Sequence, residues 1–125
     1  MFDITGQTVT TVTGNGQLSI GTDAGWWISI ESDIQYSQGE QELRQLSGDD
    51  SGTASILSPV LCGYIIQSVT IADNGLILHF SSNAKLVALT DDEFEAWNIV
   101  GPRGQRVVST PGGELATWQG DIAQQ

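Results

Sequence analysis

The stretch that decides the fold is residues 64–89, YIIQSVTIADNGLILHFSSNAKLVAL. Apolar and polar side chains alternate in 64–72 and again in 76–80, a pattern typical of half-buried β-strands. Asp73-Asn74-Gly75 between them favours a hairpin turn, because Asn and Gly tolerate positive φ. A further strand is expected at 85–89. This part of the chain therefore predicts a meander of three antiparallel strands.

The N-terminal part of the chain carries a similar pattern. Residues 8–13 are rich in β-branched side chains and predict a strand, and 17–21 predict the returning strand of a hairpin. The segment 26–31 predicts another strand, with Trp27 breaking its alternation and expected at the sheet edge. The side chains expected to share a face are Trp26, Ile28 and Ile30 here, Ile65, Val69 and Ile71 in 64–72, and Leu76, Leu78 and Phe80 in 76–80.

Three more strands are expected near the C-terminus, at 95–100, 106–109 and 114–118, with turns at 101–104 and 111–113. Together with the earlier strands they predict a mainly β domain. Its twisted antiparallel sheet is expected to curl into a sandwich or a small barrel. The whole chain, 1–125, is expected to form this one domain.

Helical signals are sparse. Thr90-Asp91-Asp92-Glu93 resembles a capping box, which predicts one short helix of a single turn. The central segment 31–53 shows no clear strand periodicity. Within it, 41–46 can form either a helical turn or a short strand, and the composition of 47–52 predicts a loop.

The charge of the chain is strongly unbalanced. Fifteen Asp and Glu face four Lys and Arg, for a formal net charge of -11. Such a surface repels nucleic acid and anionic lipid and attracts cationic proteins, so neither a nucleic-acid nor a membrane partner is expected. Taken alone, the net charge is explained equally well if the acidic residues only keep the protein soluble. Residues 1–5 lack a basic segment followed by an apolar run, which predicts a soluble cytoplasmic protein.

Residues suited to catalysis or metal binding are few. The chain has one histidine, His79, and one cysteine, Cys62. A structural zinc site needs four ligands, and a thiolate nucleophile needs a nearby base. We expect His79 to be an ordinary exposed or hydrogen-bonded residue and Cys62 a buried structural one. No catalytic, metal-binding or cofactor-binding residue is predicted, and the protein is expected not to be an enzyme.

Two acidic clusters are the candidate partner-binding residues. The central one is favoured, because an irregular segment with Gln, Ser and Leu among its charges can supply hydrogen bonds and apolar contact. The candidates are Glu40, Glu42, Asp49 and Asp50 in the central segment and Asp91, Asp92 and Glu93 before the strand at 95–100.

The end of the chain resembles a small bacterial family of uncharacterised function. Residues 94–104, FEAWNIVGPRG, and 107–118, VVSTPGGELATW, carry an E-x-W, G-P-x-G and P-G-G-E-L-A-x-W pattern similar to that family. Gly63 and the L-x-L-x-F of 76–80 extend the likeness upstream. Where the family usually has Asp-Gly after that strand, this chain has Ser82-Asn83-Ala84.

Members of that family resemble immunity proteins of polymorphic toxin systems. The resemblance implies a protein that binds a cognate toxin and occludes its active or substrate site, and it transfers no catalytic residue. A toxin with a basic, nucleic-acid or nucleotide-binding cleft would complement the charge. A structural or adaptor module and a small-ligand-binding β domain are the alternatives. Trp97 and Trp118 are expected to be buried and to pack near each other.

Overall fold

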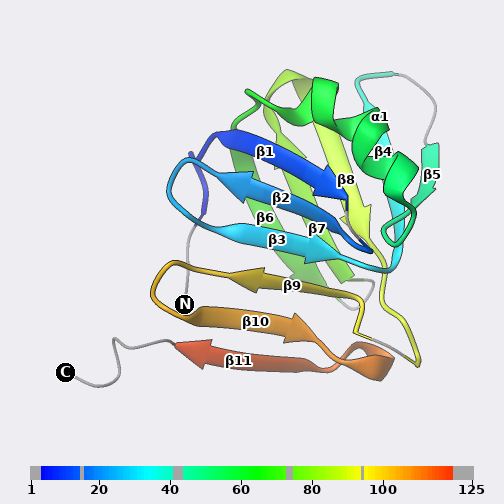
Figure 1. Ribbon diagram of the computed structural model, residues 1–125, viewed down its shortest axis with the longest axis vertical. Coiled ribbons are helices and arrows are strands. Elements are labelled where there is room, and N and C mark those ends of the chain that lie inside the picture. The colour runs from blue at the N-terminus through cyan, green and yellow to red at the C-terminus, as the bar shows by residue number, and fades with distance from the viewer. Residues whose placement is uncertain (1–3, 15, 41–43, 73–74, 94, 120–125) are drawn as a thin grey trace.

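The computed structural model describes residues 4–14, 16–40, 44–72, 75–93 and 95–119. Its first layer is an antiparallel sheet of six strands (Figure 1). In spatial order these are β1 (Val9–Gly14), β2 (Leu18–Thr22), β3 (Trp27–Ile30), β9 (Trp97–Val100), β10 (Gln105–Ser109) and β11 (Leu115–Gln119).

The second layer is an antiparallel sheet of five strands, and its strands cross those of the first at a steep angle (Figure 1). The described strands form two separate sheets and not a closed barrel, so the fold is a β-sandwich with one helix. In spatial order the strands are β5 (Arg44–Ser47), β4 (Asp33–Gln38), β8 (Ala84–Ala88), β7 (Gly75–Phe80) and β6 (Ile66–Ala72).

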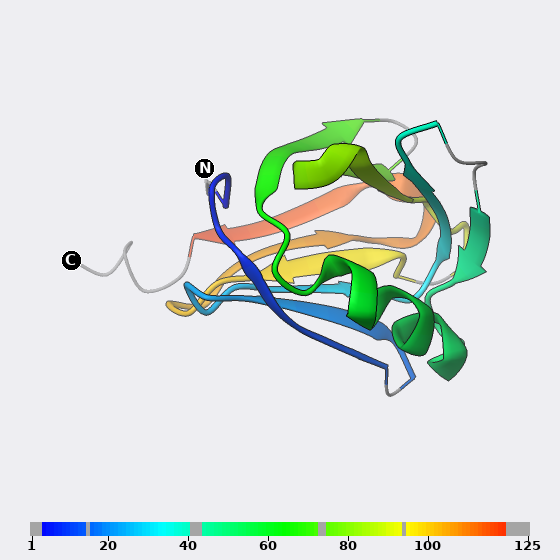
Figure 2. The same cartoon turned by 90° about the horizontal axis from the view of Figure 1, so that it is seen from above.

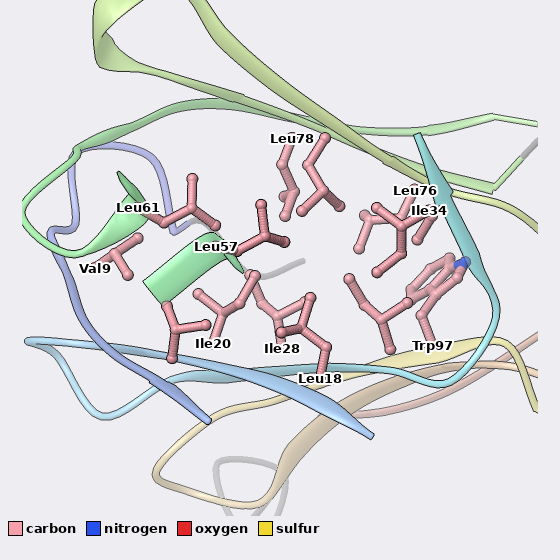
Figure 3. Packing of buried hydrophobic residues seen from close by; sticks show 14 of the residues in the cluster. Val9, Leu18, Ile20, Ile28, Ile34, Leu57, Leu61, Leu76, Leu78 and Trp97 are labelled. Atoms are coloured by element: carbon pink, nitrogen blue, oxygen red, sulfur yellow. The ribbon is translucent and has the colours of Figure 1, made fainter. Parts of the chain in front are cut away.

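One core lies between the layers and receives side chains from both sheets and from the helix (Figure 3). The faces predicted for 26–31 and 76–80 are confirmed. Burying these large aliphatic and aromatic side chains is the main favourable term in folding. The confirmed core residues are Trp26, Ile28, Ile30, Leu76, Leu78 and Phe80.

The face predicted for 64–72 is confirmed in part. Val69 packs against the core as predicted, and Ile71 pairs with the buried Leu76. The placement of Ile65 is wrong. Ile66 is fully buried, whereas Ile65 is 44% exposed and Ile71 is 37% exposed.

The pairing of β6 with β7 shifts register between Ile66 and Ser68, which marks a β-bulge. The bulge adds one residue to β6, so Ile66 and not Ile65 takes the core position before it, and the predicted alternation of Val69 and Ile71 holds after it.

The hairpin between β6 and β7 is confirmed, with Ala72 paired with Gly75; Asp73 and Asn74 lie outside the described residues. Gly75 has a φ of +113°, and a Cβ there would lie 1.9 Å from the carbonyl oxygen of Ala88. Only glycine meets both conditions. The next connection is a 3₁₀ turn, Ser81–Asn83, which confirms a turn between β7 and β8.

The position predicted for Trp27 is also wrong. It lies in the third of six strands and not at a sheet edge, and it is 42% exposed on the outer face of its sheet. The alternation is not broken there: Ile28 and Ile30 point into the core, and Trp27 takes the outward position.

The helix lies in a different place from the one predicted. It is α1 (Ser51–Leu61), beside β1 and β5 at one side of the sandwich (Figure 2). The segment 90–93 contains no helix. There the Oδ1 of Asp91 accepts a hydrogen bond from the backbone N–H of Glu93, so the polar side chain closes a local turn instead.

Three features hold α1 in place. Asp50 is its N-cap, with Oδ1 accepting from the N–H of Gly52 at 2.8 Å. Ala54, Leu57 and Leu61 are buried at helical spacing, and the helix packs mainly against β1. Packing is needed because the Gly, Ser, Thr and Pro residues of α1 have low helix propensity.

The open question at 41–46 is answered in part. Arg44–Ser47 is the strand β5, paired with β4 at the edge of the second sheet. Residues 41–43 lie outside the described part of the chain. Within the described residues, no helix is long and apolar enough to span a membrane.

The C-terminal strands follow the predicted order, with a turn at 101–104 and a 3₁₀ turn at Pro111–Gly113. Trp97 is buried, as predicted, at 2% exposure. Trp97 pairs with Ile30, whereas Trp118 pairs with Arg106 at the sheet edge, so the two tryptophan positions are not cross-strand neighbours. The side chain of Trp118 lies outside the description.

Candidate functional site

A hollow of about 430 Å³ lies between β4, β5 and the first turn of α1. This volume is within the range of small-molecule and side-chain pockets. Its lining combines two carboxylates, two amides and an apolar surface. The lining residues are Asp33, Ile34, Gln35, Gln45, Leu46, Ser47, Asp50, Gly52, Thr53, Ile56 and Leu89.

The connection between β5 and α1 shapes this hollow. The hydroxyl of Thr53 donates to the carbonyl of Ser47 at 2.6 Å, and the N–H of Asp50 donates to the same carbonyl at 3.2 Å. Gly48 packs where a Cβ would lie 2.3 Å from the carbonyl oxygen of Ile30. The end of β5 is therefore held against α1 on one side and against the connection from β3 to β4 on the other.

The polar lining of the hollow is acidic. Asp33 and Asp50 are exposed carboxylates on its wall, and the described residues that line it include no Lys, Arg or His. Asp49, exposed beside it, accepts a hydrogen bond from the hydroxyl of Ser47. Two like charges beside an apolar surface create a potential that favours a cationic group.

The central cluster predicted from the sequence is brought to this hollow in part. Asp50 lines it and Asp49 lies next to it in the chain. Glu40 is exposed in the connection between β4 and β5 but does not line the hollow. Glu42 lies outside the described residues.

The second predicted cluster lies in the connection between β8 and β9, on the same side of the molecule as β5 (Figure 1). Asp92 and Glu93 are exposed. The carbonyl of Asp91 accepts from the N–H of Gly112 at 2.7 Å, which ties this connection to the turn before β11. None of the three lines the hollow, so the structure does not merge the two clusters into one site.

Sequence reasoning missed Asp33, Gln35 and Gln45. A signal was present in β4, where Asp33 and Gln35 alternate with core residues and so had to face outward. The sequence could not show that β5 is the strand that pairs with β4 here. The pairing of Gln35 with Gln45 and of Asp33 with Ser47 brings these side chains together.

The expectation that Cys62 is buried is wrong. Cys62 is an exposed free thiol that follows α1 and caps it, with its N–H donating to the carbonyl of Ser58. The last helical residue, Leu61, takes the buried position, and Cys62 after it lies at the surface. His79 is exposed on β7 and pairs with Ser68 and Lys85. Among the described residues, no three His, Cys, Asp or Glu side chains gather as a metal site.

Tyr36 has a displaced pKa. Burial of Tyr36 raises the pKa of its phenol above the usual 10.0, and the neighbouring Tyr64 adds to the shift. Gln38 joins the two rings: its amide oxygen accepts from the hydroxyl of Tyr36 at 3.2 Å, and its amide nitrogen donates to the hydroxyl of Tyr64 at 2.7 Å. This network stabilises the neutral phenol.

Comparison with protein families identifies a family for this chain. The family described as "Family of unknown function (DUF6188)" matches residues 2–119. Comparisons with curated proteins and with solved structures each returned no match. Because the match spans nearly the whole chain, the protein belongs to the DUF6188 family.

Proposed function

We propose that this protein is an immunity protein that binds a cognate bacterial toxin in the cytoplasm and occludes its active or substrate site. The observation that carries the proposal is the hollow beside α1, whose charged lining residues, Asp33 and Asp50, are both carboxylates. The C-terminal sequence pattern, which resembles immunity proteins of polymorphic toxin systems, supports the same function.

Electrostatics favours a basic protein as the occupant. A net charge of -11 accelerates encounter with a cationic surface and discourages binding to nucleic acid. A toxin that cuts nucleic acid or binds nucleotides needs a positively charged cleft, and an acidic protein can cover such a cleft. The apolar side chains of Ile56 and Leu89 beside the carboxylates can hold the aliphatic stem of an arginine or lysine.

A small-ligand-binding domain is the second candidate, and the volume of the hollow favours it. About 430 Å³ is enough for a small molecule. The two candidates differ in what co-purifies with the protein. An immunity protein forms a stoichiometric complex with the toxin, and a ligand binder retains a small molecule that mass spectrometry of the denatured protein detects.

The test uses the product of the gene next to the one that encodes this chain. We expect its expression alone to arrest bacterial growth, and co-expression with this protein to restore growth. A neighbouring product that is harmless, or toxicity that the protein does not relieve, would contradict the immunity function.

Two matched double variants then locate the interface. Asp33→Asn with Asp50→Asn removes both charges from the hollow, and Asn at position 50 still caps α1. Asp92→Asn with Glu93→Gln removes two exposed charges from the second cluster. We expect the first pair to weaken protection and binding and the second to leave both nearly unchanged. The reverse result would place the interface on the connection before β9.

A further inference from the structure

The hydrogen-bond acceptors of the acidic hollow come from three different elements. Asp33 and Gln35 lie on β4, and Gln45 lies on β5. Asp50 precedes α1 as its N-cap. The pairing of Gln35 with Gln45 sets these two amides opposite each other on neighbouring strands. Acceptors therefore stand on more than one wall of a space of about 430 Å³.

The two carboxylates of the hollow are held in place and still have oxygens available. The N–H of Leu89 donates to the backbone carbonyl of Asp33 at 3.0 Å, and β4 is paired on both sides. The carboxylate of Asp33 has no hydrogen bond or ion pair with any residue that the structure describes. Asp50 uses Oδ1 for the N–H of Gly52, which leaves its second oxygen for a ligand. A ligand loses little freedom to such a preformed site beyond its own.

The potential in the hollow is negative, and no cation of the described chain fills it. Arg44 lies on the same strand as Gln45, but it does not line the hollow and is paired with Tyr36. The positive end of the α1 dipole amounts to about half a charge, and Asp50 already accepts from its first turn. The two full negative charges outweigh it.

An arginine side chain matches these acceptors better than a lysine does. A guanidinium carries five N–H donors in one plane, so it can bond to acceptors on two walls at once, whereas an ammonium presents three donors around a single atom. The guanidinium is also more weakly hydrated, which suits a partly apolar lining. Ile56 and Leu89 supply the apolar surface along which its methylene stem can lie.

We propose that the hollow binds the side chain of one arginine from the basic cleft of the toxin, and that Asp33 and Asp50 balance the charge of its guanidinium. The source of the arginine rests on the proposed immunity function, whereas the chemistry of the site rests on the hollow itself. An arginine held here is no longer free to bind a phosphate of the toxin's substrate, which gives the occlusion a chemical basis.

The test titrates the full chain with two peptides that differ only in their cationic residue, acetyl-Gly-Arg-Gly-amide and acetyl-Gly-Lys-Gly-amide. NMR follows the backbone amides of Gln45 and Gly52 at the hollow and of Ile71 on β6, the opposite edge of the second sheet. We expect the arginine peptide to shift the first two saturably and not the third. The lysine peptide should bind at least about threefold more weakly, because it cannot form the planar pair of charge-assisted hydrogen bonds.

Asp33→Asn is the informative variant, because it removes one charge from the hollow and keeps both the side-chain shape and the N-cap of α1. It should weaken binding of the arginine peptide at least about threefold, the scale of a partly exposed ion pair. Glu114→Gln is the matched control. Glu114 is an exposed carboxylate before β11 that does not line the hollow, so its loss should leave the affinity nearly unchanged.

Three results would overturn the arginine site: no saturable shift with the arginine peptide, equal binding of the two peptides, or binding that Asp33→Asn leaves unchanged. Growth protection separates this inference from the immunity function. Protection by a protein that binds neither peptide would overturn the arginine site alone. Selective binding of the arginine peptide by a protein that gives no protection would support the site and overturn the toxin as the source of the arginine.

Discussion

The strand β9 and the helix α1 both contribute to the core, but they are held there by different forces. Trp97 and Ile99 of β9 are buried in strict alternation, and β9 is paired on both sides, with β3 and β10. The helix α1 has no such ladder. It depends on its N-cap and on a few buried side chains such as Leu57 (Figure 3).

This difference shows that the local sequence pattern determines the structure of β9, whereas tertiary contacts determine that of α1. The period of β9 favours a strand regardless of its neighbours. The composition of α1 disfavours a helix, and only the space between β1 and β5 selects it. The acidic hollow is formed in part by α1, so its geometry depends on α1 remaining packed against the sheets.

The largest effect is expected from Trp97→Ala. Removing this buried indole leaves a large cavity, and the free energy of unfolding should fall by about 3–5 kcal/mol. Chemical denaturation measures it. Trp97→Phe is the control and should cost clearly less, because Phe fills most of the space and removes an indole N–H that has no hydrogen-bond partner. A loss under about 1 kcal/mol for the alanine variant would contradict the core position.

Leu57→Ala should come next, with a loss of about 2–4 kcal/mol. Leu57 is fully buried in α1. Hydrogen exchange separates the two elements: we expect the α1 amides to lose protection in this variant while those of β9 keep most of theirs. Equal loss in both elements would show that α1 and the sheets form one cooperative unit.

Asp50→Ala should cost about 1 kcal/mol, because it removes the N-cap of α1. Asp50→Asn retains a capping oxygen and should be nearly neutral in thermal unfolding. If Asn were as destabilising as Ala, the charge of Asp50 and not its hydrogen bond to Gly52 would be what stabilises the helix.

The smallest effect concerns Tyr36 and appears only in alkaline solution. Its pKa is raised in the folded state, so the unfolded chain loses this proton first. Stability is therefore retained below pH 10 and declines as the pH rises above that value. Tyr36→Phe should flatten the decline, measured by urea unfolding at several alkaline pH values. An unchanged slope would assign the alkaline loss to other groups.

Much of the fold was predictable because strands carry a local period. The hairpin around Gly75 and the inward faces of β3 and β7 follow from alternation and turn chemistry. Alternation fails only across the bulge at the start of β6, because a bulge is a property of the strand pair. Alternation also could not locate α1, because the apolar side chains of the helix are buried only through its packing against β1.

The candidate site was less predictable for the same reason. Asp50 was predicted as a partner-binding residue from the charge and the irregular pattern of its segment. Asp33 joins it in the hollow only because β4 pairs with β5. Sequence spacing identifies which residues are acidic or aromatic, and pairing decides which of them meet.

The most direct test of the central claim is calorimetry of the complex with the proposed toxin at low and high salt. Wild-type protein should bind with an affinity that falls as salt rises, because exposed charges steer association. The Asp33→Asn, Asp50→Asn double variant should bind more weakly and show a smaller salt dependence. Equal affinity of both proteins at both salt concentrations would contradict the claim that the acidic hollow binds the partner.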